Sequence, residues 1–294
     1  MQGRPIMQDG PLPPLDSVFY NSDQKTSYGI TLIGGPKHGG QKNRIWILDT
    51  GIDGNHPDLA LSLRDTRSLA RSYTGNNPLV DQSGHGTHCA GIAAAFKQDT
   101  MGIGMNGVAP GAPIISMQVM NGEGIGSWIN VLFALNHIAI NKNNQDIELM
   151  SLGEYKVERC SNSNPALRDA INNLSRGSRG AFVVMSAGNC EDSTNNCTID
   201  KQANYNLPGC IKGPNIFTVT SLDFNQNALT ACAPYSFLAH NTVDFIAPGT
   251  LVFSTFKDSN YIAMSGTSMA AAMVAGIISG KNGAPERDNS SRML

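Results

Sequence analysis

The sequence predicts one α/β domain, built on a mostly parallel central sheet with helices on both faces. Short apolar runs rich in β-branched residues alternate along the chain with segments whose apolar residues recur at helical spacing. Strands that alternate with helices pair in parallel, and the connecting helices then cover the two faces of the sheet. A chain of 294 residues is also long enough to bury a sizeable core.

The expected strands and helices follow one another in a regular order. The first strand, RIWIL at 44–48, stops at Asp-Thr-Gly, and the first helix, at 85–96, begins with His-Gly-Thr before small apolar residues follow at helical spacing. A glycine-rich stretch at 121–126 separates the second strand from the second helix. The remaining strands are expected at 113–120, 147–152, 181–189, 215–222 and 243–249, and the remaining helices at 127–140, 164–174 and 268–279.

The two ends of the chain differ from its middle. Residues 1–22 are rich in proline and polar residues, and they are interpreted as an arm or the remnant of a linker. The folded domain is expected over 23–280, followed by a polar tail at 281–294. The opening residues contain no apolar stretch of the signal-peptide type, so the chain is expected to be either cytosolic or a processed form of something longer.

The charge balance argues against two classes of partner. Charged residues make up 15% of the chain, with a net charge of −2 and a pI near 6.3, so nothing favours binding to nucleic acid or to an anionic membrane. No apolar run approaches the ~18 residues of a membrane span. We therefore expect neither nucleic acid nor a membrane as partner.

The cysteines point to an oxidising compartment. None of their spacings is C-x-x-C, which disfavours zinc ribbons and thioredoxin-like redox sites. Disulfides, and hence secretion, are the favoured interpretation, although the pairing is left open and a local Cys190–Cys197 bond is one alternative. The six cysteines are Cys89, Cys160, Cys190, Cys197, Cys210 and Cys232.

Three polar residues stand where a parallel sheet forms its sites, at the carboxyl ends of strands and the amino ends of helices. Asp49 ends the first strand, while His85 and Ser268 open two helices of small residues. A serine hydroxyl attacks well only when a base removes its proton, an imidazole is suited to that role, and a buried carboxylate can orient the imidazole. Asn189 ends another strand, and its amide could donate to the oxyanion, with the Ser268 N–H as second donor.

Two other interpretations of these stretches are weaker. A metal site at His85 and His88 needs a third ligand at a sensible spacing, and the chain has no H-E-x-x-H pattern. The stretch at 102–107 fits G-x-G-x-x-G, but it lacks the preceding strand and following helix of a dinucleotide site.

From about Tyr28 to Gly276 the chain resembles the subtilisin-like serine proteases, or subtilases. ILDTGIDGNHPDL resembles the family's aspartate segment, GHGTHCAG its histidine segment and SGTSMA its serine segment, in the family's Asp–His–Ser order. The resemblance implies a subtilisin-like fold, a catalytic triad of Asp49, His85 and Ser268, and an oxyanion hole that includes Asn189. It makes His88 a structural neighbour of His85.

The resemblance also implies how a polypeptide substrate binds. SLG at 151–153 and SAGN at 186–189 resemble the family's substrate-binding segments, and 122–126 corresponds to an extended edge that pairs with the substrate backbone. A solvated turn is the alternative for that stretch. The implied substrate-binding residues are Gly122, Gly124, Ser151, Leu152, Gly153, Ala187 and Gly188.

The chain departs from the family pattern in ways that bear on activity. Ala271, Ala272 and Met273 replace the usual residues after the nucleophile, among them a proline, so we expect a straighter or shifted helix that still forms. The chain also ends at Leu294, soon after this helix. Glu154 stands where a second glycine is common, and we hypothesise that it favours a basic residue before the scissile bond, against a side chain that only points to solvent.

The expected function is therefore serine endopeptidase activity on unfolded or flexible polypeptides, with an inhibitory propeptide as a further partner. No cofactor is expected for the chemistry; a structural calcium ion near Gln24 and Asp58 is left open, because these two residues alone do not fill its coordination sphere. Cys89 is expected to be a free, buried thiol. The alternatives are a catalytically impaired relative that binds peptides or a partner, and a maturation peptidase with one substrate.

Overall fold

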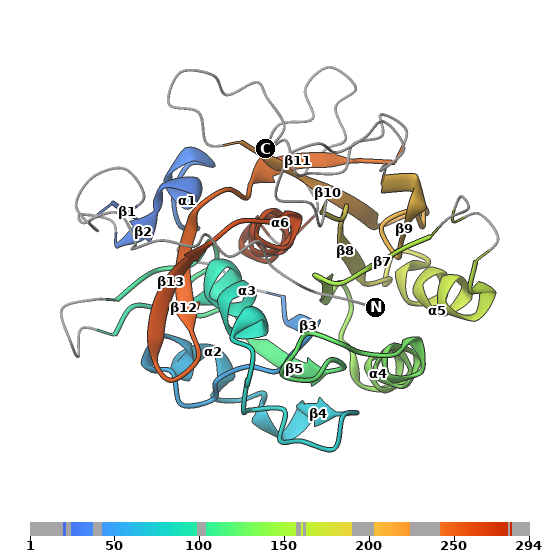
Figure 1. Cartoon of the computed structure of the whole chain (residues 1–294), viewed down its shortest axis with the longest axis horizontal. Coiled ribbons are helices and arrows are strands. Elements are labelled where there is room, and N and C mark those ends of the chain that lie inside the picture. Colours follow the sequence, from blue (N-terminus) through green and yellow to red (C-terminus); the bar gives the residue numbers. More distant parts are fainter. Residues whose placement is uncertain are drawn as a thin grey trace.

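A seven-stranded sheet forms the centre of the computed structural model, in the order β11-β10-β8-β6-β3-β5-β4 (Figure 1). Every pair of neighbouring strands in it is parallel. The structure describes residues 20–21, 25–37, 43–98, 104–156, 160, 163–189, 203–223, 242–281 and 283. The strands of the sheet are β3 (Ile45–Asp49), β4 (Arg71–Ser72), β5 (Ile114–Gln118), β6 (Ile147–Met150), β8 (Phe182–Ser186), β10 (Ile216–Leu222) and β11 (Phe245–Pro248).

The sheet separates two apolar cores, because successive side chains of a strand point to opposite faces. On β3, Ile45 and Ile47 belong to one core, and Trp46 and Leu48 to the other. The first core includes residues of the helices α3 (His85–Ala94) and α6 (Thr267–Lys281). The second includes residues of α4 (Trp128–Asn141) and α5 (Pro165–Ser175). This arrangement confirms the predicted parallel sheet with helices on both faces.

Helix α6 lies at the middle of the molecule (Figure 1). Every residue from Thr267 to Ser279 is buried, and the helix packs against α3 and against β6, β8, β10 and β11. Ala271, Ala272 and Met273 continue it without a break, so the expectation that the helix survives the loss of proline is confirmed. A helix that is apolar on all sides is typical of such a buried position.

Several short elements were not predicted. The largest is an antiparallel hairpin of β12 (Val252–Phe256) and β13 (Asn260–Met264), whose turn residues Asp258 and Ser259 adopt left-handed φ angles of 59° and 57°. Because the turn contains no glycine, its sequence signal is weak. The others are β1 (Tyr20–Asn21), β2 (Thr26–Ser27), β7 (Glu154–Tyr155), β9 (Asn206–Leu207), α1 (Tyr28–Leu32), α2 (Ala60–Leu63) and the 3-10 turns η1 (Pro57–Leu59), η2 (Arg67–Leu69) and η4 (Ala203–Tyr205).

The described cysteines behave in two ways. Cys160 and Cys210 form a disulfide, which ties the segment after β7 to the segment after β9. Cys89, in α3, is free and buried, as expected. The suggested Cys190–Cys197 pair and Cys232 lie outside the described residues. Within the described helices, none has the length and apolarity needed to cross a membrane.

Candidate active site

The predicted site residues gather along the carboxyl edge of the sheet. Asp49 is the last residue of β3, Ser151 follows β6, and Ala187 follows β8. His85 is the first residue of α3, and Ser268 is the second residue of α6. The fold therefore brings strand ends and helix starts to one place, where open parallel sheets form their sites.

A short hydrogen bond joins Asp49 to His85. The Oδ1 atom of Asp49 lies 2.7 Å from Nδ1 of His85, and both side chains are 1% exposed. The same oxygen accepts the N–H of Thr50 at 2.7 Å. Burial alone would lower the pKa of His85, but the charge and hydrogen bond of Asp49, with a smaller contribution from Asp81, raise it above its ordinary value.

Two glycines allow this close approach of α3 and β3. A Cβ at Gly86 would overlap the carbonyl oxygen of Gly51, so only glycine lets the first turn of α3 lie against the end of β3. Gly84 has a φ of 93°, and the ring of Phe256 fills the place of its missing side chain. Close packing therefore explains why the residues on either side of His85 are glycines.

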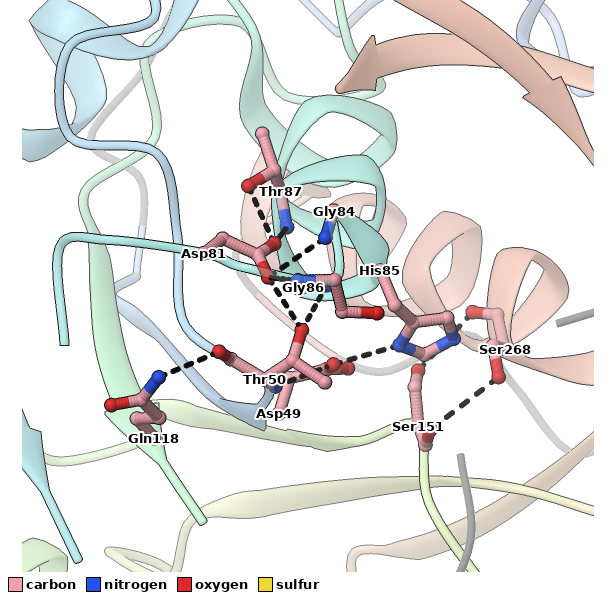
Figure 2. Close-up of polar contacts among 11 residues, drawn as sticks. Asp49, Thr50, Asp81, Gly84, His85, Gly86, Thr87, Gln118, Ser151 and Ser268 are labelled. Carbon is pink, nitrogen blue, oxygen red and sulfur yellow. Dashed lines mark hydrogen bonds and ion pairs between the residues drawn. The ribbon is translucent and has the colours of Figure 1, made fainter. Parts of the chain in front are cut away.

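Ser268 lies beside the open side of the imidazole. In Figure 2 the ring of His85 stands between Asp49 and Ser268, and its Nε2 is a buried atom without a hydrogen-bond partner among the described residues. The Ser268 hydroxyl donates to the carbonyl of Ser151 at 3.4 Å, and the Ser151 hydroxyl donates to the carbonyl of Ser268 at 3.2 Å. No hydrogen bond joins Ser268 to His85 in the described structure, so proton transfer needs a rotation of the serine side chain.

Asn189 is anchored to the start of α6. Its Oδ1 accepts the N–H of Thr267 at 2.9 Å, which leaves the Nδ2 donor on the other side of the amide. A Cβ built on Gly266 would lie 3.3 Å from that Nδ2 and 3.8 Å from the Ser268 nitrogen. One small space therefore borders both donors that sequence analysis assigned to an oxyanion.

The neighbours of His85 on α3 are structural. Nε2 of His88 lies 3.1 Å from the Ile262 carbonyl, and burial lowers the pKa of His88 to about 3, so it donates as a neutral ring. Burial raises the pKa of the Cys89 thiol well above its usual value. Asp49, His85 and Cys89 form the one close group of metal-ligand types among the described residues. In that group Asp49 and His85 already bond to each other.

The stretch 121–126 differs from its expected extended form. Gly122 and Gly124 lie in a turn closed by a bond from the Gly124 N–H to the Asn121 carbonyl, and the bridge residues of the stretch are Ile125 and Gly126, with Gly126 opposite Met120. The Asn121 side chain stabilises the turn, because its Oδ1 accepts two main-chain N–H groups at 3.0 Å. The prediction of an extended edge is wrong for 122–124, and substrate binding by the two glycines stays a prediction.

Of the other predicted substrate-binding residues, Ser151 contacts Ser268 and Gly188 contacts the start of α6. Ser151 and Leu152 are buried, and Gly153 packs against the side chain of Asn206. The N–H of Gly188 donates to the Thr267 hydroxyl at 3.2 Å. These contacts hold the segments after β6 and β8 against the start of α6.

Glu154 is not a bare carboxylate. Its Oε2 accepts the indole N–H of Trp128 at 2.6 Å, and its Oε1 lies 2.8 Å from Nζ of Lys156. Burial opposes ionisation, but these two partners lower the pKa of Glu154 overall. Its charge is therefore balanced by Lys156, and its side chain links the start of α4 to β7.

Asp58, the described half of the suggested calcium pair, has other partners. Its carboxylate accepts the N–H groups of Gln98 and Met105, both at 2.8 Å, and the hydroxyl of Tyr261 at 2.7 Å. Among the described residues, Asp58 belongs to no group of three or more metal-ligand side chains. Gln24 lies outside the described residues, so structural calcium stays a prediction, and nothing in the chemistry below depends on it.

Sequence analysis missed two residues behind the Asp49–His85 pair. Asp81 is 5% exposed and accepts five hydrogen bonds from Thr50 and from residues 83–87 (Figure 2). Thr50 links it to the end of β3. The only sequence signal for Asp81 was an aspartate four residues before the first histidine.

Known proteins resemble this chain over most of its length. The model of the subtilase family matches residues 40–280. Thermitase from Thermoactinomyces vulgaris is 33% identical over 81% of this chain and 74% of its own length. Subtilisin E from Bacillus subtilis (strain 168) is 33% identical over 89% of this chain and 62% of its own length. The solved structure of sphericase superposes with a TM-score of 0.69 and 28% identity, covering 89% of this chain and 85% of that one.

The fold is a parallel α/β sheet, and the Asp49, His85 and Ser268 side chains lie together at its carboxyl edge. With the matches above, the chain belongs to the subtilase family of subtilisin-like serine endopeptidases.

Proposed function

We propose that the chain hydrolyses peptide bonds through an acyl-enzyme, with Ser268 as nucleophile, His85 as general base and Asp49 as the carboxylate that orients His85. The observation that carries this proposal is the 2.7 Å hydrogen bond between Asp49 Oδ1 and His85 Nδ1. It leaves Nε2 as the nitrogen on the Ser268 side, where a base must lie.

The steps follow from these positions. As Ser268 Oγ attacks the scissile carbonyl carbon, Nε2 of His85 takes the hydroxyl proton and Asp49 stabilises the imidazolium. His85 then gives that proton to the amine of the leaving peptide. The amine departs, and the acyl group remains bound to Ser268 as an ester. Water, activated by the same nitrogen, hydrolyses the ester and restores Ser268. These steps need only side chains and water.

The oxyanion of the tetrahedral intermediate is placed beside Gly266, between Nδ2 of Asn189 and the N–H of Ser268. The positive end of α6 adds to the stabilisation. Asn189→Ala is expected to lower kcat about 10² to 10³-fold with little change in KM, the loss measured for the equivalent donor in a subtilisin. A fall confined to kcat/KM through a raised KM would contradict this role.

A second candidate function is peptide or partner binding without cleavage. One observation favours it: the Ser268 hydroxyl donates to Ser151 and not to His85. If that bond persisted with substrate, the serine would keep its proton and remain unreactive.

Labelling with a serine-directed fluorophosphonate separates the two functions. We expect one adduct by intact mass on the parent chain, none on Ser268→Ala and one on Ser265→Ala, a buried serine three residues away that serves as the matched control. Failure of the folded parent chain to react would favour the binding protein. An adduct that survives in Ser268→Ala would remove Ser268 from the mechanism.

We also propose that the substrate is an extended, flexible polypeptide, bound by main-chain pairing near 125–126 and 151–153, and that an inhibitory propeptide is a further partner. Secretion is the proposed localisation, supported by the Cys160–Cys210 disulfide, because such bonds persist in oxidising compartments. Reaction of the purified native protein with a thiol reagent tests the disulfide: Cys160 and Cys210 should stay unlabelled until a reductant is added.

A further inference from the structure

Asp81 lies buried behind the pair that carries the proposed chemistry, and every partner of its carboxylate is uncharged. Oδ1 accepts the Thr50 hydroxyl at 2.9 Å and the N–H groups of Ser83 and Gly84 at 3.1 and 2.8 Å. Oδ2 accepts the N–H and the hydroxyl of Thr87 at 2.9 and 2.7 Å. Hydrogen bonds of this kind hold a carboxylate in place without removing its negative charge.

These bonds connect the two elements that bear Asp49 and His85. The first turn of α3 has free N–H groups, and its N-cap residue, Gly84, has no side chain to accept them. Asp81 accepts the N–H groups of Gly84 and Thr87, while the Thr50 hydroxyl accepts the N–H group of Gly86 at 3.1 Å. Because the same hydroxyl donates to Asp81, the start of α3 is fastened to the residue after Asp49 (Figure 2).

Thr50 is itself fixed on its other side. Its carbonyl accepts the side-chain amide of Gln118 at 2.8 Å, and its N–H donates to Asp49 at 2.7 Å. A shift of Asp81 would therefore reach Asp49 through one residue and His85 through one helical turn.

We propose that Asp81 is a positioning residue for His85: its carboxylate fastens the first turn of α3 to the end of β3 and places a second negative charge behind the Asp49–His85 pair. This inference rests on the proposed function of His85 as the base. It goes beyond the triad, because Asp81 touches neither the substrate nor the reacting atoms.

Among the described residues, few charged groups face His85, so the charge of Asp81 can influence the pKa of its ring. Asp49 faces it from β3; on its own helix His88 is neutral, and Cys89 is a protonated thiol. Lys257, from the β12–β13 turn, donates to the Gln82 carbonyl at an exposed position, and no described salt bridge involves Asp81. Asp49 and Asp81 are accordingly the charges that raise the pKa of His85. Burial raises the pKa of Asp81 itself, while the bonds from Gly84 and Thr87 lower it.

The sign of the expected effect follows. His85 must be neutral to act as base, so kcat/KM falls as the pH drops through its pKa. A negative charge nearby stabilises the protonated ring. Asp81→Asn, which removes the charge and keeps the shape, should move the acid limb of kcat/KM to lower pH by roughly half a unit or more. It should also lower kcat at the optimum by roughly tenfold, because the pair loses its anchor.

The matched control is Asp58→Asn. Asp58 is also a buried carboxylate held by uncharged donors, two main-chain N–H groups and a hydroxyl against three N–H groups and two hydroxyls for Asp81, but its charge does not act on His85. Both variants should lose stability, whereas the acid limb should move only in Asp81→Asn. An unmoved limb in Asp81→Asn, or an equal shift in both, would show that Asp81 is only a structural cap and overturn the proposal.

Two further measurements keep the test decisive. NMR titration in a Ser268→Ala background follows the ionisation of His85 directly, and the His85 signal is assigned by its absence in His85→Ala. If the parent chain is inactive, the proposed function fails, but the effect of Asp81→Asn on the pKa of His85 can still be measured. If Asp81→Asn does not fold, Thr50→Val removes only the link. It should lower kcat with the acid limb in place, and an unchanged kcat would refute the fastening role.

Discussion

At the scale of single residues, Gly266 shows how little room the proposed oxyanion site has. A methyl group there would lie 3.3 Å from Nδ2 of Asn189, 3.8 Å from the Ser268 nitrogen and 3.6 Å from Sδ of Met269. We expect Gly266→Ala to lower kcat by about tenfold or more while KM changes little, because both donors act on the transition state. Steady-state kinetics on a peptide substrate measures this. Gly283→Ala, whose methyl group meets nothing within 4 Å, is the control, and a raised KM with unchanged kcat would place Gly266 in substrate binding instead.

The effect of Glu148 on the stability of the fold depends on pH. It lies on β6 with no exposed surface, opposite Trp46 and Val183, and neither carboxylate oxygen has a hydrogen-bond partner among the described residues. Burial raises its pKa to about 8 from the ordinary 4.5. A folded-state pKa above the unfolded value means that stability is fully present below about pH 4.5 and is lost as the pH rises to about 8.

Glu148→Gln should remove this dependence. As the pH rises from 5 to 9, we expect the free energy of unfolding of the variant to increase by about 4 kcal/mol relative to that of the parent, since the amide does not ionise. Urea unfolding at both pH values, in a Ser268→Ala background that prevents self-digestion, gives the two free energies. Parallel pH curves for parent and variant would mean that Glu148 stays ionised or finds a partner.

At the scale of elements, the disulfide secures the short β7–β9 ladder next to the proposed substrate segment. It joins cysteines 50 residues apart, and closing a loop of that length contributes about 4 kcal/mol in the chain-entropy account. Replacing Cys160 and Cys210 together by alanine should lower the free energy of unfolding by an amount of that order. Cys89→Ala, which removes a thiol without a crosslink, is the control; equal losses in the two variants would show that the crosslink itself contributes nothing.

The charge pair after β6 bears on specificity. Because Lys156 balances Glu154, we expect the parent chain to cleave peptides with Lys or Leu before the scissile bond at similar rates. Lys156→Ala should raise kcat/KM for Lys over Leu by roughly threefold, a small effect because both side chains are partly exposed. Lys156→Arg, which keeps the charge, should leave the ratio unchanged. No change in Lys156→Ala would show that Glu154 lies too far from the substrate to act on it.

At the scale of the whole molecule, the sheet was predictable because its strands are buried on both faces and appear as continuous apolar runs. The positions of Asp49, His85 and Ser268 followed from strand ends and helix starts, and the resemblance added their order. The β12–β13 hairpin was not predictable, because its turn uses Asp258 and Ser259 in place of glycine.

Other parts of the site depend on contacts that no local pattern reveals. The Asn121 side chain decides between a turn and an extended edge at 122–124 through two hydrogen bonds. The surroundings of Asp81 arise only when Thr50 and α3 meet in the fold. Glu154 could be recognised as unusual, but its partner Trp128 comes from helix α4, 26 residues earlier.

The central place of α6 also governs the order in which the molecule is completed during synthesis. Asp49 and His85 leave the ribosome early, whereas Ser268 lies in the last described helix, which contacts four strands of the sheet and fills one of the two cores. Until that helix emerges, the growing chain has Asp49 and His85 but not Ser268, and one face of its sheet lacks the helix that packs on it. If Ser268 is the nucleophile, as proposed, the chain therefore gains its cutting group only together with the helix that completes its core.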